Sequence, residues 1–398
     1  MVDCRFEVRL KQHTPMIHFQ HDQAGATLRA TEVKPKLDRY VRKHLNAKKD
    51  DRLRYQAHIR PVGEPVEDSD RPHSLYFGNM GNNVRYKHAI RHENVDLCIN
   101  AYFDKKLADA IYKAIPECFA QENFGTRQNK GFGSFYPDNN GSDSEISPIE
   151  TVLKSTGKPI YYFGFNKNAN PLDHVDALYK AMKSGINGPR EDDFYFKSLL
   201  WRYFNKDKER DELITWEKRF MKQSLIDEAV SRGRDGNSER RKRDYMDDPR
   251  YLRIVLGLTD SYTYKYVYIR GLNVTIDEAG PDPDYGDTRA LRLQKGRPYE
   301  FNASHPKMAR FKSPITFKPV GHRVYVIADP EAYKPVLGQK FTFQCGRINE
   351  KLKAPDEFDI ADFLAFAAEQ VNAFRSGGNG PMANRLKSIN LHPLNQGG

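Results

Sequence analysis

The sequence is poor in cysteine, and the four cysteines it has are scattered along the chain. None of them forms a C-x-x-C pair; they are Cys4, Cys98, Cys118 and Cys345. Zinc sites and disulfide frameworks need clustered or regularly spaced cysteines. The pattern therefore argues against both and favours reduced thiols in the cytoplasm. We expect no metal site and no cofactor.

Long apolar runs are also missing. The longest fall far short of the roughly 20 residues that cross a bilayer, and the N-terminus "MVDCRFEVRL" lacks the apolar core of a signal peptide. We therefore expect no membrane partner. Apolar residues make up only 38% of the chain, yet aromatic residues reach 12%. Because disordered chains lack aromatic residues, we predict a folded protein, and its 398 residues indicate two domains.

Positive charge is the strongest feature of the composition. The formal net charge is +11 at pH 7. A basic chain favours an anionic partner, because each phosphate that it neutralises releases condensed counterions. Nucleic acid is the favoured class of partner. Charge alone does not separate RNA from DNA or from an acidic protein.

The first third of the chain alternates strand and helix patterns. Residues 31–45 carry one apolar stripe at helical spacing, with Thr31 as the expected cap, and Asp104 is the expected cap of the second helix. The order is β-α-β-β-α-β, the ferredoxin-like arrangement of RNA-recognition modules. The predicted elements are helices at 31–45 and 104–121 and strands near 5–20, 54–62, 93–103 and 133–137, the first of them broken or bent at Thr14-Pro15.

The rest of the chain predicts a second ferredoxin-like domain, so the fold class is α+β. Strands resume with "YKYVYIRGLNVTI", "RFKSPITFKPV", "HRVYVIA" and "KFTFQCGRI", and residues 251–258, "YLRIVLGL", also have a strand pattern. A final helix covers about 359–374. The predicted divisions are a first domain at 1–137, a linker at 138–155, a second domain at 156–376 with a charged helical insertion at about 190–250, and a flexible tail at 377–398.

A glycine-rich stretch follows the second helix and reads "NFGTRQNKGFGSFYP". Successive backbone amides around glycines form anion-binding concavities, and Arg127 and Lys130 add positive charge beside them. On another reading the stretch is a tight helix-to-strand turn, in which the glycines serve geometry alone. It is not a nucleotide-binding P-loop, because the closing Lys-Ser/Thr pair is missing.

Several stretches resemble one family. "ATLRATEVKPKLDRYV", placed after a first strand with "HTPMIHF", is similar to the helix start of RAMP-superfamily subunits of CRISPR effector complexes. "FGTRQNKGFGSF" resembles the glycine-rich loop of that superfamily. "YLRIVLGL" and "RFKSPITFKPV" resemble strands in the second half of its larger members. The chain looks most like the large distal RAMP subunit of type III-B (Cmr) complexes, built as two ferredoxin-like domains.

The resemblance implies a non-catalytic RNA-binding subunit of a type III CRISPR ribonucleoprotein that acts in antiviral defence. Its implied partners are crRNA, target RNA and other subunits of the complex. Phosphate contacts position RNA and aromatic side chains stack on unpaired bases. The implied RNA-binding residues are Arg29, Lys34, Lys36, Gly125, Arg127, Lys130, Gly131, Gly133 and Ser134.

Two other functions stay open. A RAMP endoribonuclease would cut crRNA precursors by metal-independent acid–base chemistry, with His18 or His21 as the catalytic group. A protein-interaction scaffold would use its basic charge only to offset acidic neighbours. The run Arg240, Arg241, Lys242 and Arg243 is either a further RNA contact or a solvated charge run.

Overall fold

The structure is a computed structural model. It describes residues 3–17, 27–64, 66–67, 89–138, 146–188, 194–209, 212–232, 249–258, 261–264, 267–270, 288–291, 299–306, 308 and 311–394. Helices and mainly antiparallel sheets are mixed along this part of the chain, which confirms the α+β class. Among the described residues, no helix is both long and apolar enough to cross a bilayer.

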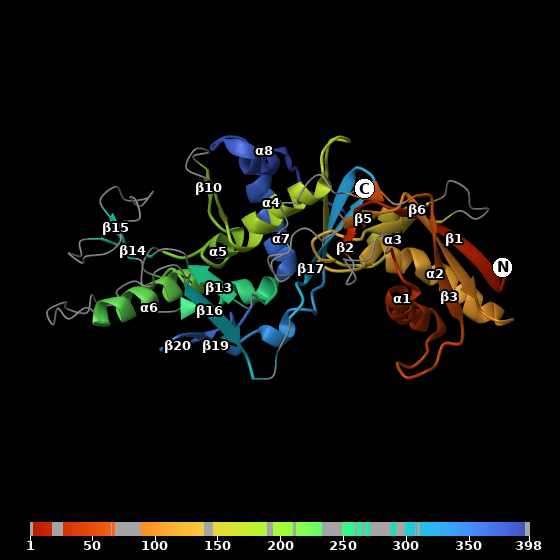
Figure 1. Cartoon of the computed structure of the whole chain (residues 1–398), viewed down its shortest axis with the longest axis horizontal. Helices are drawn as coiled ribbons and strands as arrows, with labels where there is room; N and C mark the ends of the chain where they lie inside the picture. The colour runs from red at the N-terminus through yellow and green to blue at the C-terminus, as the bar shows by residue number, and fades with distance from the viewer. Residues whose placement is uncertain are drawn as a thin grey trace.

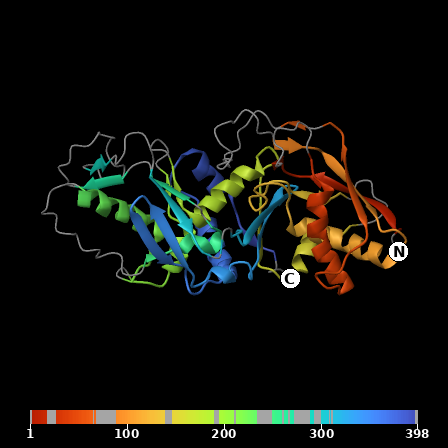
Figure 2. The same ribbon diagram turned by 60° about the horizontal axis from the view of Figure 1, so that its bottom comes forward.

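The first unit has the predicted β-α-β-β-α-β succession. Its sheet is antiparallel with the order β3-β6-β1-β7, and Figure 2 shows α1 and α2 together beside it. The elements are β1 (Arg5–Gln12), α1 (Ala30–Leu45), β3 (Gln56–Val62), β6 (Asn94–Asn100), α2 (Lys105–Gln121) and β7 (Phe135–Pro137). A small sheet lies at one end: β2 (Met16–Ile17), β4 (Val66–Glu67) and β5 (Ala89–Arg91).

The two helices form because their apolar residues recur on one face. In α1 this stripe is Val33, Leu37, Tyr40 and Val41, all buried against the sheet core. The predicted cap of α2 is confirmed, because the Asp104 carboxylate accepts from the amide of Leu107 at 2.9 Å. The predicted Thr31 cap is wrong: the N-cap of α1 is Arg29, two residues earlier, and it makes no side-chain cap bond.

The second unit repeats the succession of the first. Its sheet has the order β17-β18-β8-β21, again antiparallel throughout. With strands numbered along each unit, both sheets have the order 2-3-1-4. The elements are β8 (Ile160–Gly164), α4 (Pro171–Lys183), β17 (Ile315–Val320), β18 (Arg323–Ala328), α7 (Ile360–Ala373) and β21 (His392–Pro393). Helix α3 (Ile149–Lys154) lies in the predicted linker and packs on α2.

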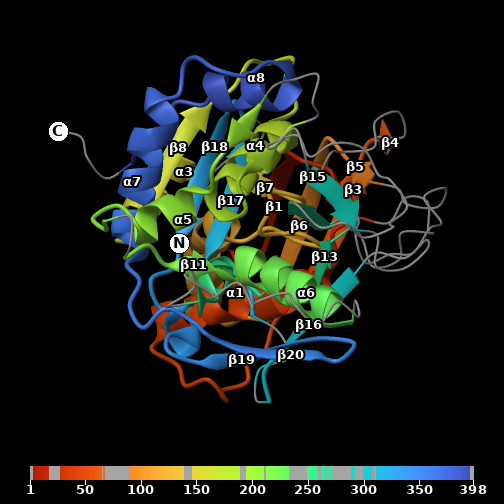
Figure 3. The same ribbon diagram turned by 90° about the vertical axis from the view of Figure 1, so that its left-hand side faces the viewer.

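Two insertions interrupt this second unit, and they carry a sheet of their own. Figure 1 shows this sheet at the opposite end of the molecule from the first unit, with α4, α7 and β17 between them. In the end-on view of Figure 3, α6 lies over β19 and β20. The sheet order is β11-β12-β20-β19-β16-β13. Within the described part of the predicted insertion at 190–250, the helices α5 and α6 are the longer elements, and β10, β11 and β12 have two residues each.

Most of the inserted elements are short, and the helix α6 is the longest of them. The first insertion holds β9 (Ile186–Asn187), β10 (Tyr195–Phe196), α5 (Leu199–Phe204), β11 (Thr215–Trp216), α6 (Glu217–Arg232), β12 (Pro249–Arg250), the 3-10 helix η3 (Leu252–Leu256), β13 (Ser261–Tyr264), β14 (Val267–Arg270), β15 (Thr288–Leu291) and β16 (Tyr299–Ser304). The second holds η4 (Lys334–Val336), β19 (Lys340–Cys345) and β20 (Ile348–Lys353).

Two further predictions differ from the structure. "YLRIVLGL" forms η3 instead of a strand: all five residues of η3 are buried, and the amide of Leu252 donates to the Glu217 carboxylate at 3.0 Å. The tail expected after residue 376 contains a helix, α8 (Gly380–Ser388), and the strand β21. Both are held by burial, since Ala383, Leu386 and Leu391 are within the core of the second unit.

Candidate nucleic-acid interface

The glycine segment, defined here as residues 122–134, connects α2 to β7 and lies between the two units. Its residue Thr126 bridges to Ile17 of β2, and Lys130 bridges to Phe317 of β17. The amide of Phe317 donates to the carbonyl of Asn129 at 3.0 Å. The segment is therefore part of the contact between the first and second units, with backbone pairing on both sides.

The structure gives a protein-internal reason for the glycines. Gly133 has φ +64°, and a Cβ at this position would collide with the carbonyl oxygen of Phe124. Gly125 has φ +78°, and a Cβ there would lie 2.6 Å from the carbonyl oxygen of Ile17. Both positions combine a left-handed backbone with close approach of another chain segment, which only glycine tolerates. This agrees with the reading in which glycines serve the geometry of a turn.

The backbone amides around residue 131 are already paired inside the protein. Gly131 donates to the carbonyl of Gln128 at 3.3 Å, Gly133 donates to Pro15 at 2.9 Å, and Ser134 donates to the Thr14 hydroxyl at 3.0 Å. The Ser134 hydroxyl in turn donates to the carbonyl of Pro319 at 2.6 Å. In this arrangement these N–H groups are not available to hold a polyanion, so any binding of RNA by the segment falls to its side chains.

The basic side chains of the segment lie beside α4 and form, with Lys180, what we call the outer cluster (Arg127, Lys130 and Lys180). The Lys130 ammonium sits 4.7 Å from the centroid of the Tyr179 ring. Burial lowers the pKa of Lys130, and the charges of Arg127 and Lys180 lower it further, while Asp176 opposes them. Like charges that are partly withdrawn from water favour a bound anion.

The opposite side of the segment carries what we call the inner cluster (Lys36, Glu122 and Lys318). Lys318 lies on β17 and is fully buried, and its ammonium donates to the carbonyls of Glu122 at 2.9 Å and Phe135 at 2.8 Å. Lys36 donates to the carbonyl of Asn123 at 2.5 Å and lies 3.3 Å from the Glu122 carboxylate. Cations near the C-terminus of α2 are favoured by its unpaired carbonyls.

Glu122 is the one carboxylate of the inner cluster, and carbonyl oxygens accept from both of its lysines. Burial lowers the pKa of Lys318 well below its ordinary value. Burial alone would raise the pKa of Glu122, but the charges of Lys36, Lys312 and Arg39 lower it. A cavity of about 280 Å³ opens beside Glu122 and is lined from both units, including Tyr40 and Thr316. The inner cluster thus joins the two units.

The remaining predicted residues are spread over α1 or lie outside the described residues. Arg29 is exposed at the start of α1. Lys34 pairs with Asp38 at 3.2 Å and lies 3.5 Å from the Tyr55 ring centroid, so it faces away from the glycine segment. The described residues do not include His18, His21 or the run at 240–243. Searched within the same residues, groups of three or more potential metal ligands are absent.

Sequence reasoning missed Lys318. In "ITFKPV" it is a single lysine on an otherwise apolar strand, and alternation places it on the opposite face from Phe317. A lysine flanked by apolar residues was the only signal. The sequence does not show that two carbonyls from residues 122 and 135 meet at that point, since this depends on how the units pack.

Comparisons with known proteins cover nearly the whole chain. Residues 3–186 match the family model of the Cmr1 N-terminal domain, and residues 195–388 match that of the Cmr1 C-terminal domain. No curated protein matches. Among solved structures, the crystal structure of Cmr1 from Pyrococcus furiosus in its apo form has 9% sequence identity and a TM-score of 0.35, with 98% of each chain covered. The family models divide the chain between 186 and 195, whereas the sheet topology assigns β8 and α4 to the second unit.

Proposed function

Because the chain belongs to the Cmr1 family, which implies a subunit of a type III CRISPR complex, we propose that it is a non-catalytic RNA-binding subunit of that complex. Its RNA is crRNA, target RNA or both, and its other partners are the subunits beside it. It acts in the cytoplasm in antiviral defence. The RNA contacts are made by basic side chains of the glycine segment and not by its amides.

The outer cluster is the observation that carries this proposal. Arg127 and Lys130 are half-buried, lie next to Lys180, and have one acidic neighbour in common, Asp176. Asp176 is itself bonded to Lys180 at 2.7 Å. Positive charge therefore exceeds negative charge in this group, and the whole chain carries a net charge of +11. An RNA phosphate relieves this imbalance and releases counterions on binding. Arg29 is a further candidate contact, because its side chain is exposed.

Removal of the outer charges tests the proposal. Arg127→Gln with Lys130→Gln should weaken binding of a fluorescein-labelled single-stranded RNA by roughly 10-fold at moderate salt. It should also reduce the slope of log K against log salt by about 1.4, since each lost phosphate contact contributes about 0.7. Fluorescence anisotropy across a salt series measures both.

A matched control comes from the β19–β20 hairpin, where Arg347 and Lys351 are exposed. Arg347→Gln with Lys351→Gln removes the same charge at the far end of the molecule and should leave the slope unchanged. Equal slopes for the two double variants would overturn the assignment to the outer cluster.

The endoribonuclease alternative is tested separately. His18 and His21 lie outside the described residues, so no structural observation favours it. Purified protein is incubated with CRISPR repeat RNA without metal, and the products are separated on a denaturing gel. We expect intact RNA. Specific cutting that disappears in His18→Ala or His21→Ala would contradict the non-catalytic part of the proposal.

A further inference from the structure

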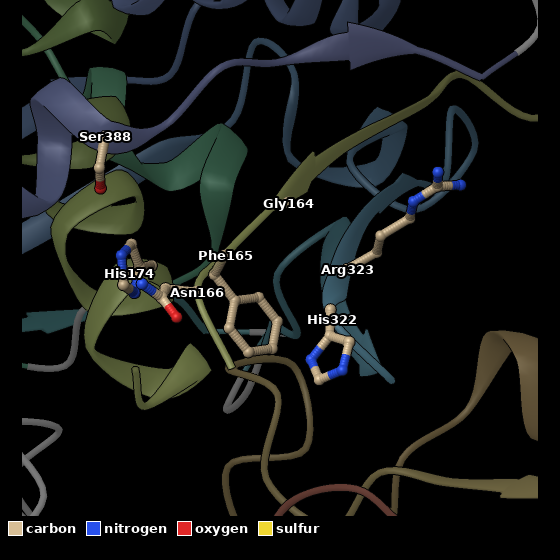
Figure 4. Close-up of a pocket in the computed structure, with 7 residues that line it drawn as sticks. All are labelled: Gly164, Phe165, Asn166, His174, His322, Arg323 and Ser388. Atoms are coloured by element: carbon tan, nitrogen blue, oxygen red, sulfur yellow. The ribbon is translucent and has the colours of Figure 1, made fainter. Parts of the chain in front are cut away.

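A second feature of the surface lies where β8 ends, α4 begins and the β17–β18 hairpin turns. Here the second unit forms a pocket of about 450 Å³. Figure 4 shows Phe165 and His322 reaching into the same space, with Asn166 and His174 beside them. The lining residues are Gly164, Phe165, Asn166, His174, His322, Arg323 and Ser388.

Three flat rings define the inner part of the pocket. The Phe165 ring centroid lies 6.3 Å from that of His174 at an interplanar angle of 33°, and 6.2 Å from that of His322 at 75°. The backbone holds this arrangement, because the amide of Phe165 donates to the carbonyl of His322 at 3.0 Å. Phe165 is half-buried and His322 is exposed, so the rings are open to a ligand. Planar groups suit such a wall, since every base has a face that stacks on an aromatic side chain.

The imidazole of His174 is set to act as a neutral ring. Its Nδ1 lies 3.2 Å from the carbonyl oxygen of Asn170, so Nδ1 carries the proton and Nε2 is an acceptor. Burial lowers the pKa of His174. A neutral ring with one acceptor is better suited to bind the edge of a base than to bind a phosphate, because a phosphate needs a cation.

Polar and charged groups at the mouth complete the site. Asn166 is exposed and offers an amide, which can both donate to and accept from a base edge. Arg323 is exposed too; it pairs with Glu150, and its guanidinium carbon lies 5.0 Å from the Tyr162 ring centroid. A base in the inner part would place its phosphate toward this outer side.

The pocket and the outer cluster share α4. His174 lies in the first turn of this helix and Lys180 six residues later, roughly 9 Å along the axis at about 1.5 Å per residue. The hairpin is also tied to the first unit, because the amide of Gly321 donates to His13 Nδ1 at 3.2 Å. One RNA strand that contacts the outer cluster is thus within reach of the pocket.

From these contacts we infer that the pocket holds one unpaired nucleobase of a single-stranded RNA, stacked on Phe165 between His174 and His322. The inference rests on the proposed function and adds a base-binding site to it. Phosphate contacts position the strand, and the pocket holds a base that has left the stack.

The test compares an ordinary RNA oligonucleotide with one that carries abasic positions. Phe165→Ala should lower the affinity of the full-length protein for the ordinary RNA by roughly 5- to 150-fold, the range for one base stacked on an aromatic side chain. The same variant should bind the abasic RNA as the unchanged protein does. Phe165→Tyr should retain most of the affinity, and Tyr195→Ala, at a ring that is 68% exposed on β10, serves as control.

Photochemical crosslinking provides a second measurement on the unchanged protein. RNA that contains 4-thiouridine is irradiated in the complex, and the crosslinked peptides are identified by mass spectrometry. A crosslink within residues 164–174 or at His322 supports the inference. The inference would be overturned if crosslinks were found only elsewhere, or if Phe165→Ala and the unchanged protein bound ordinary RNA with equal affinity. In either case, salt-dependent binding of RNA by the unchanged protein would still support the proposed function. Absence of salt-dependent RNA binding by the unchanged protein would instead overturn the proposed function.

Discussion

The two sides of the glycine segment hold cations in contrasting ways. On the inner side, Lys318 is fully buried and bonded to two carbonyls, and Glu122 lies close to Lys36. On the outer side, Lys130 is half-buried and lies over a tyrosine ring, next to other cations. Cations outnumber carboxylates on both sides, but on the inner side the ammonium groups of Lys36 and Lys318 are bonded to protein carbonyls. The balance of local partners, and not the presence of lysine or arginine, separates a structural cluster from a candidate RNA contact.

The largest expected effect concerns the inner packing of the segment. Gly133→Ala should lower the free energy of unfolding by more than about 3 kcal/mol, because it adds a collision with the Phe124 carbonyl to an unfavourable positive φ. Urea unfolding followed by circular dichroism measures the loss. Gly63→Ala is the matched control: its φ is +78°, no atom lies within 4 Å of the added Cβ, and about 1 kcal/mol is expected. Equal losses would show that the inner side is not tightly packed.

A smaller effect is expected at the buried lysine. Lys318→Met keeps most of the side-chain volume but leaves the carbonyls of Glu122 and Phe135 without this donor. We expect a loss of about 2 kcal/mol in the free energy of unfolding at pH 7. The midpoint of urea unfolding measures it. A midpoint equal to that of the unchanged protein would contradict the role of Lys318 in joining the units.

The pH dependence of that loss sharpens the same prediction. Burial holds the pKa of Lys318 well below its value of about 10.4 in an unfolded chain. At pH values below the pKa of Lys318 in the unfolded chain, folding must therefore release a proton from Lys318 or bury its charge, and both cost free energy. This cost shrinks as pH rises toward about 10.4, so the difference in stability between unchanged protein and Lys318→Met should widen with rising pH. A constant difference would show that Lys318 binds its proton equally in both states, and a narrowing difference would show that folding raises its pKa; either contradicts the prediction.

The smallest effect is expected on the outer side. Lys130→Met removes a partly desolvated charge among like charges but keeps an apolar side chain beside Tyr179. The free energy of unfolding should change by less than about 0.5 kcal/mol. Lys36→Met, whose ammonium bonds Asn123 and Glu122, is the inner-side counterpart and should cost about 1 kcal/mol or more. If Lys130→Met destabilised the protein as much as Lys36→Met, the distinction between the clusters would fail.

Local patterns predicted a large part of the architecture. The stripes of α1, α2 and α7 predicted helices within one or two residues of their observed ends, and Asp104 was correctly identified as a cap. The succession β-α-β-β-α-β was also evident in the first unit. These features depend on side-chain periodicity and on hydrogen bonds between near neighbours, both of which are encoded locally.

Non-local contacts account for the errors. Residues 252–256 have a strand pattern but form η3, in which the amide of Leu252 donates a hydrogen bond to the carboxylate of Glu217, 35 positions earlier in the chain. The residues after 376 form α8, because Ala383 and Leu386 are buried in the core, and β21, because His392 and Pro393 pair with the edge of β8. In the glycine segment, the same glycines fit an anion site or a tight turn, and only the positions of Ile17 and Phe124 distinguish the two.

The sequence by itself determined the α+β class, the helices with clear stripes, the excess of positive charge and the resemblance to the RAMP superfamily. Tertiary structure alone decided which cations are enclosed and which stay near the surface, and which glycine amides already have partners. The physical reason is that the state of a charged or polar group depends on its solvent exposure and on partners brought by distant segments. For Lys318 those partners come from nearly 200 residues earlier in the chain.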